Sequence, residues 1–239
     1  MMQQTLTYEA DGLTMQSQLF FEPGAAPRPG VLVFPEAFGL SEHAIGKAQR
    51  LATMGYVALA CDLHGNAVIE NDLQAAIGLL QPLLAEPSKT RGRAAGGLAA
   101  LVARPEVDAG RTAAIGFCFG GTMALELARS GAAIRAAVGF HSGLGTTAPA
   151  SDAKAIKGRV LVCIGADDPM IDAKQRATFE DEMRGAGIDW QMHLYGGVVH
   201  SFTNPKAAER NMPDALRYSA EADARSWASM TQLFGEVFA

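Results

Sequence analysis

A cysteine flanked by glycines stands where an apolar strand pattern meets a helix-forming stretch, and this junction constrains the fold most. Residues 112–117, TAAIGF, lead into GFCFGG, and TMALELARS follows at once. The spacing G-x-C-x-G places Gly116 and Gly120 two residues either side of Cys118, where a sharp strand-to-helix turn leaves no room for side chains. The pattern predicts a nucleophile elbow at Cys118. The N-terminus of the following helix should favour a thiolate there.

Short apolar stretches alternate with amphipathic ones along most of the chain. Strands are expected at 31–34, 57–61, 112–117, 134–140, 159–165 and 190–195. Helices are expected at 41–54, 70–103, 119–130, 172–186 and 214–237. Ser41 and Gly55 are expected to cap the first of these helices. Such alternation is typical of an α/β fold in which helices cover both faces of a mostly parallel sheet.

An antiparallel hairpin and one continuous domain complete the expected architecture. Residues 5–9 and 14–21 are predicted to pair through a tight turn at Asp11-Gly12, since both residues tolerate positive φ. No repeat or linker interrupts the series of elements. Residues 1–239 are therefore predicted to form a single domain, with 143–158 as an excursion above the sheet.

Charge and cysteine content narrow the expected partners. The net charge is -5 without a large basic cluster, which gives no electrostatic footprint for nucleic acid or an anionic membrane. A small molecule is the expected partner. The three cysteines lack CxxC spacing and indicate neither a disulfide framework nor a zinc site. No apolar run approaches the roughly 18 residues of a membrane helix, and no signal-peptide pattern opens the chain, so a cytoplasmic protein is expected.

An acid and a histidine follow the elbow in the order that an α/β-hydrolase fold requires. The strand expected at 159–165 runs into GADDP, and the strand expected at 190–195 is followed by GGVVHSF. The order predicts an α/β-hydrolase fold with Cys118 as nucleophile and His200 as base. The alternative is that Cys118 is a buried core cysteine whose glycines serve helix–strand packing. Asp167 and Asp168 are both candidates for the acid.

The chain resembles the dienelactone hydrolase family over essentially its whole length. The matching stretches are FPEAFG at 34–39, DLHG at 62–65, GFCFGG at 116–121, GADDP at 165–169 and GGVVHSF at 196–202. The family pattern G-x-x-D selects Asp168 as the acid and leaves Asp167 as a solvated neighbour or a helix cap. The resemblance also implies that Glu36 lies in the active site and holds the cysteine in a protected state until substrate arrives. A surface glutamate in a loop is the alternative for Glu36.

Backbone amides and a few side chains complete the expected site. The N–H groups of Ala37 and Phe119 are predicted to form the oxyanion hole that this fold uses. Phe38, His64 and His141 are candidates for contact with substrate. His64 and His141 follow the ends of strands on the crevice side. The residues expected to be structural instead are His43, His193, Cys61 and Cys163.

The expected reaction is acyl transfer in two halves, without a cofactor or a metal. Cys118 attacks the carbonyl of a small ester or lactone, and His200, oriented by Asp168, protonates the leaving group and then activates water. A non-catalytic binding protein with the same fold is the first alternative, although the intact cysteine, aspartate and histidine series argues against it. A thiol redox protein is the second, and it would want a resolving cysteine near Cys118.

The expected substrate differs from that of the dienelactone-cleaving members. The resemblance implies that those members hold a substrate carboxylate with arginines after the fourth strand and just past the catalytic histidine. Here residues 66–70 and 203–206 contain no arginine, and Lys206 is the one candidate counter-charge near Glu36 and Glu70. We therefore predict a preference for neutral, activated esters with aryl leaving groups, extending to neutral phosphotriesters.

Overall fold

Eight strands of the described residues, 1–24 and 26–239 of the computed structural model, form one sheet in the order β1-β2-β4-β3-β5-β6-β7-β8. The strands are β1 (Met2–Ala10), β2 (Leu13–Phe21), β3 (Arg28–Phe34), β4 (Val57–Ala60), β5 (Val107–Phe117), β6 (Ala136–Phe140), β7 (Arg159–Gly165) and β8 (Trp190–Tyr195). The pairings from β4 through β8 are parallel, whereas β1 and β2 add an antiparallel edge.

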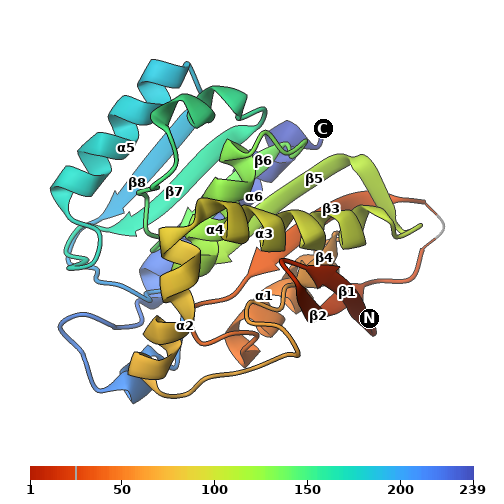
Figure 1. The fold of residues 1–239 in the computed structure, drawn as a ribbon, viewed down its shortest axis with the longest axis horizontal. Coiled ribbons are helices and arrows are strands. Elements are labelled where there is room, and N and C mark those ends of the chain that lie inside the picture. Colours follow the sequence, from red (N-terminus) through yellow and green to blue (C-terminus); the bar gives the residue numbers. More distant parts are fainter. Residues whose placement is uncertain (25) are drawn as a thin grey trace.

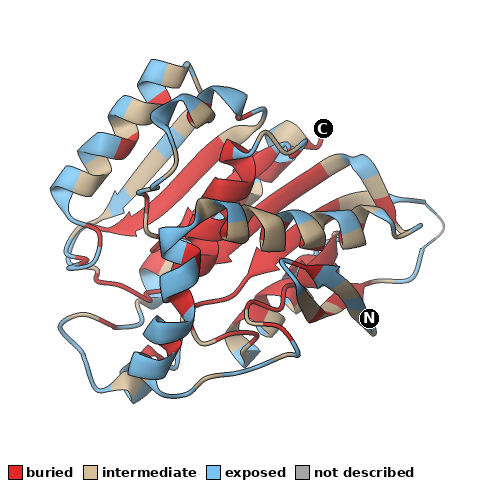
Figure 2. Cartoon of the chain, in the orientation of Figure 1, coloured by how far each residue is buried: buried red, intermediate tan, exposed pale blue. Residues whose placement is uncertain are grey.

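Helices cover both faces of this sheet (Figure 1). They are α1 (Glu42–Thr53), α2 (Leu73–Ala85), α3 (Pro87–Val102), α4 (Phe119–Arg129), α5 (Ala173–Ala186) and α6 (Ala220–Val237), with the short 3₁₀ helices η1 (Ala150–Ala155) and η2 (Ala207–Arg210). One core lies under α1 and α6, and another lies under α3, α4 and α5. The central strands are buried between them (Figure 2). The expected α/β-hydrolase fold, with a mostly parallel sheet between two helical layers, is confirmed.

The predicted hairpin is present at the antiparallel edge. Its turn has φ of 51° at Asp11 and 70° at Gly12, as a two-residue turn with positive φ at both positions requires. The pairing runs from Met2 opposite Phe21 to Ala10 opposite Leu13. An exposed edge of the parallel strands is thereby covered by a short local element.

Three helix ends differ from the sequence expectation. The helical region expected at 70–103 is two helices that meet at Glu86. Pro87 is the first residue of α3, where a backbone N–H has no acceptor within the helix, so proline is tolerated there. The last helix begins at Ala220 rather than 214, since Ser219 caps it by accepting the N–H of Ala222. Ser41 precedes α1 as expected, but its side chain makes no capping hydrogen bond.

The segment 143–158 is held at its start. Arg129 is buried in α4 and donates to the carbonyl oxygen of Leu144 at 2.8 Å, while its other nitrogens pair with Glu126 and Glu182. Gly145 and Thr146 of this segment line two neighbouring surface hollows, and the chain then enters η1. No helix in the described part of the chain combines the length and the apolar character needed to cross a lipid bilayer.

Candidate active site

The turn at Cys118 is sterically defined by its glycines. Cys118 has φ of 54° and ψ of -122° between the end of β5 and the start of α4. A side chain at Gly116 would collide with the carbonyl oxygen of Gly120, and one at Gly120 would collide with the carbonyl oxygens of Phe34 and Pro35. The strained backbone therefore presents a half-buried thiol at the carboxyl end of the central strand.

His200 and Asp168 form a buried pair near this turn. His200 Nδ1 donates to Asp168 Oδ2 at 2.7 Å, and both residues are 3 % exposed. The other oxygen, Oδ1, accepts the backbone N–H of Met170 at 2.8 Å, which fixes the carboxylate. Asp167, by contrast, is exposed. Of the two adjacent aspartates, the geometry joins Asp168 to the histidine.

Cys118 influences the charge state of His200. Nε2 is buried and has no hydrogen-bond partner among the described residues, so the sulfur of Cys118 does not meet hydrogen-bond geometry in this resting arrangement. Burial by itself lowers the pKa of His200, but the Cys118 thiolate and Asp168 outweigh burial and hold this pKa well above its ordinary value. Cys118 and His200 therefore interact electrostatically, and hydrogen bonds in active sites commonly tighten when substrate binds.

Glu36 lies at the end of β3 with its carboxylate fully engaged. It is 4 % exposed, and its oxygens accept from Ser201 Oγ at 2.9 Å and from Asn204 Nδ2 at 2.6 Å. Both donors belong to the loop that carries His200. The sequence did not single out Ser201 or Asn204, because hydrogen bonds between residues 165 and 168 positions apart follow no local spacing rule.

Ala37 and Phe119 are brought to the same region by different elements. Phe119 is the first residue of α4, where backbone N–H groups have no acceptor within the helix. Ala37 follows Glu36. Because Gly120 has no side chain, the backbone of Phe34 and Pro35, just before Ala37, can pack directly against the elbow. Both residues are nearly buried. The two amides are thus available on neighbouring segments.

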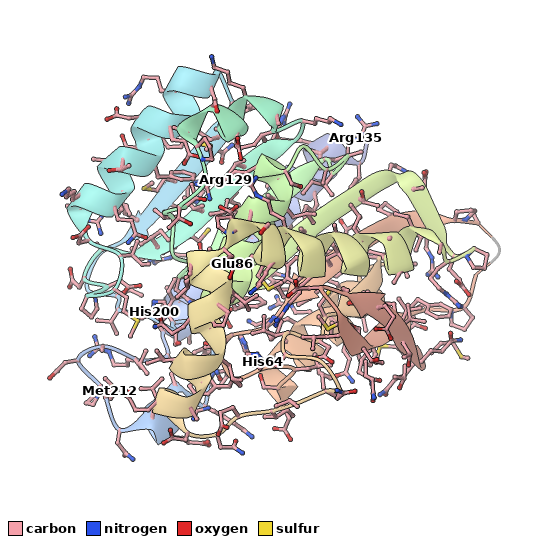
Figure 3. The ribbon with its side chains drawn as sticks, in the orientation of Figure 1. His64, Glu86, Arg129, Arg135, His200 and Met212 are labelled. Atoms are coloured by element: carbon pink, nitrogen blue, oxygen red, sulfur yellow. The ribbon has the colours of Figure 1, made fainter. Side chains whose placement is uncertain are left out.

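The three candidates for substrate contact have different surroundings. Phe38 is half-buried and lies beneath the guanidinium of Arg210 at 3.5 Å from its ring centre. His64 Nε2 lies 2.8 Å from the carbonyl oxygen of Ala37 and so supports that loop. His141 has no exposed surface and cannot touch a substrate in this arrangement. His200 and His64 lie toward the same end of the molecule as α2, whereas Arg135 lies at the opposite end (Figure 3).

The charges near Glu36 differ from the sequence expectation. Lys206 was the expected counter-charge, but its Nζ pairs with Glu42 at 2.6 Å on the surface. Both Lys206 and Arg210 border the hollow of about 230 Å³ that Glu36 also lines, so a second cation lies near Glu36. Arg210 was not predicted because it ends η2, a 3₁₀ helix in a stretch without helical periodicity.

A larger hollow adjoins the elbow on the side of α3 and α4. Its volume is about 380 Å³, and its lining includes Phe119 and Thr122 of the first turn of α4. Leu83, Leu84 and Pro87 provide an apolar wall. Within this lining the one charged side chain is Glu126, which pairs with Arg91 at 2.9 Å and Arg129 at 3.1 Å. The hollow therefore suits an uncharged group.

Comparisons with known proteins agree with this architecture. The sequence profile of the dienelactone hydrolase family matches residues 17–238. The structure "m3DLH" is 46% identical with a TM-score of 0.95 and covers 100% of this chain and 99% of its own. A dienelactone hydrolase-like promiscuous phosphotriesterase from metagenomic libraries is 44% identical, also with a TM-score of 0.95 and the same coverage. A Bradyrhizobium protein named "Probable 2-oxo-3-(5-oxofuran-2-ylidene)propanoate lactonase" is 31% identical over 73% of this chain and 73% of its own. The chain therefore belongs to the dienelactone hydrolase family, and it is a hydrolase that acts on ester or lactone bonds.

Proposed function

We propose that this chain hydrolyses small neutral carboxylic esters or lactones through a covalent acyl-enzyme on Cys118. The observation that carries the proposal is the buried hydrogen bond of 2.7 Å between His200 and Asp168, next to an elbow whose Cys118 raises the pKa of His200. A binding protein would have no need for a charged pair at a strained turn, because both the strain and the buried charge cost stability.

In the first half-reaction, the Cys118 thiolate attacks the carbonyl carbon. The resulting oxyanion accepts the N–H groups of Ala37 and Phe119. The protonated His200 donates its Nε2 proton to the leaving oxygen as the carbon–oxygen bond breaks, which releases the alcohol and leaves a thioester. Asp168 holds the ring in the orientation that this transfer needs.

In the second half-reaction, neutral His200 takes a proton from water as the water oxygen attacks the thioester carbon. Collapse of the tetrahedral intermediate expels the Cys118 thiolate and releases the acid. The imidazolium and thiolate pair is restored, so the net change is one ester and one water converted to one acid and one alcohol. The proposed steps require only the side chains and amides named here.

Trapping the intermediate tests this proposal. Mixing the protein with p-nitrophenyl valerate should release a burst of about one p-nitrophenolate per active site if deacylation is the slower step, and intact mass after acid quench should show one acyl group. Peptide mapping should place it on Cys118. Cys118→Ala should show neither signal. Turnover by Cys118→Ala at the wild-type rate would overturn the proposal, and absence of any hydrolysis by the wild type would favour a binding protein.

The neutral hollow beside the elbow supports the proposed preference for uncharged acyl groups. We expect kcat/KM for p-nitrophenyl valerate to exceed that for mono-p-nitrophenyl glutarate by at least about tenfold, because the hollow beside the elbow has no cation in its lining and burying a second carboxylate there without a partner is costly. The two esters share a leaving group and a chain length, so they differ mainly in charge. A preference for the glutarate would instead assign Arg210 to the binding of a substrate anion.

Promiscuous phosphotriester hydrolysis is a second proposed activity, supported by the 44% identical phosphotriesterase. The Cys118 sulfur would attack phosphorus, the aryloxide would leave, and water would then cleave the sulfur–phosphorus bond. An aryl dialkyl phosphate should give multiple turnovers that persist in chelator and stop when Cys118 is alkylated. A single stoichiometric release of phenolate would show that the adduct only inactivates the enzyme.

A further inference from the structure

His141 is a completely buried histidine in an unusual backbone conformation. It follows β6 directly and has φ of 40°, in the left-handed region that non-glycine residues rarely occupy. Its side chain has 0 % exposure. A buried polar residue at a strained backbone position is maintained only where the surrounding contacts enforce it.

The imidazole of His141 joins two segments that are far apart in the sequence. Nδ1 accepts the backbone N–H of Cys118 at 3.2 Å, an N–H that it shares with the carbonyl oxygen of Phe140 at 3.0 Å. Nε2 lies 2.8 Å from Thr203 Oγ1. Cys118 is the elbow residue, and Thr203 lies three residues after His200. One ring therefore spans the gap between the segment of the nucleophile and the segment of the base.

The protonation state of this ring follows from its surroundings. Burial, followed by electrostatic repulsion from His200, His43 and Lys47, lowers the pKa of His141 well below its ordinary value. The ring is therefore neutral near neutral pH. Since Nδ1 accepts from Cys118, the single proton lies on Nε2 and is donated to the Thr203 hydroxyl.

Two further contacts fix the arrangement. The ring of His141 lies edge-on to the ring of His200, with centroids 5.0 Å apart and planes inclined by 66°. Thr203 is itself fully buried, and His43 Nε2 of α1 lies 3.0 Å from its carbonyl oxygen. The loop that carries His200 is thus held between two imidazoles, His141 just after β6 and His43 in α1. Burial lowers the pKa of His43 as well.

We propose that His141 is a positioning residue that sets the separation of Cys118 and His200 through its bonds to Cys118 and Thr203. The proposal rests on the catalytic roles proposed above for these two residues. A rigid aromatic ring with one acceptor and one donor at fixed separation is suited to this role, whereas a flexible side chain would let the two segments move independently. A displacement of about 1 Å between reacting groups can lower a rate by about 100-fold.

Substitution of the ring separates positioning from folding. His141→Phe retains the ring and loses both hydrogen bonds, and His141→Asn accepts the left-handed backbone readily while its side chain is too short to reach Thr203. Each should lower kcat for p-nitrophenyl valerate by about 10- to 100-fold with KM nearly unchanged. The control is His193→Phe, which removes a half-buried histidine of β8 that bonds Ser229. It should have wild-type kinetics.

A second readout does not depend on turnover. The rate of Cys118 alkylation by iodoacetamide, measured against pH, reports how strongly the thiolate pairs with His200. The charged or titratable groups nearby that also influence this pairing are Asp168, Glu36, His43 and Lys47. The midpoint should move to higher pH in His141→Phe, because a looser pair stabilises the thiolate less. A residue that served folding alone would lower thermal stability and leave the midpoint in place, and that result would overturn the proposal.

Thr203 provides an independent arm in case His141→Phe does not fold. Thr203→Val should reproduce the loss of kcat, and Thr203→Ser should restore most of it. Adding His141→Asn to Thr203→Val should lower the rate little further, because both changes break the bond between His141 and Thr203, while the 3.2 Å contact of the Thr203 hydroxyl with His43 is already lost in Thr203→Val. Fully additive losses, or a wild-type rate in Thr203→Val, would reject the bridge. A wild type in which Cys118 is never acylated would instead reject the proposed function itself.

Discussion

Asp167 and Asp168 are adjacent in the chain and have opposite environments. The side chain of Asp168 has 0 % exposure and is held by His200 and by the backbone N–H of Met170, whereas Asp167 is exposed. The sequence left both open as the acid until the family pattern selected Asp168. Local spacing cannot separate two neighbouring carboxylates, because the choice depends on the direction in which the chain leaves β7.

We predict that Asp168→Asn lowers kcat by about 10³- to 10⁴-fold, since an amide can donate to Nδ1 and favour the wrong tautomer of His200. Asp167→Asn should stay within about twofold of the wild type, as expected for an exposed residue without a role. Steady-state kinetics on one aryl ester measure both. The opposite ranking would move the acid to Asp167.

A change in the charge state of His200 is also expected when the nucleophile is removed. Cys118→Ala deletes the thiolate that raises the pKa of His200, and burial, which lowers it, remains. The imidazole should therefore titrate at lower pH in Cys118→Ala than in the wild type, while the fold stays intact. NMR titration of the histidine side chains measures the midpoint, with Cys61→Ala as a control for loss of a buried thiol. An unchanged midpoint would show that the thiolate does not act on this ring.

At the scale of elements, the turn between β5 and α4 is fixed by backbone contacts rather than by side chains. Gly116 faces the carbonyl oxygen of Gly120, and Gly120 faces the end of β3. Backbone atoms in the middle of a sheet cannot move aside without breaking ladder hydrogen bonds. The sequence made this element predictable because only glycine at both positions allows so sharp a turn.

Gly116→Ala should therefore destabilise the protein by about 3 kcal/mol or more, as a severe case of overpacking. The matched control is Gly46→Ala on the exposed side of α1, where an added Cβ has no neighbour within 4 Å outside its own helix. That change should stabilise by about 0.5–1 kcal/mol through helix propensity and chain entropy. Urea denaturation followed by circular dichroism compares the two, and equal stability of Gly116→Ala and wild type would contradict the steric account.

At the scale of the whole molecule, the sequence predicted the layered architecture and the candidate site residues better than it predicted the contacts between side chains. Alternation of apolar strands with helices indicated the sheet, and chain order indicated Cys118, Asp168 and His200 as members of one site. The partners of Glu36, the stacking of Arg210 on Phe38 and the burial of His141 were not predictable in this way. Each depends on how elements far apart in the chain meet, and no local periodicity encodes that.

The strand order also has a consequence for the time course of folding. Strands β5 to β8, which carry Cys118 and His200, pair in chain order, whereas β3 must insert between β4 and β5 and bring Val31 opposite Ala113. Pairings across long stretches of chain close more slowly than local ones. We therefore expect Glu36 and Ala37, which follow β3, to join the site last. During refolding, protection of the amides of β6 and β7 from hydrogen exchange should precede the return of esterase activity.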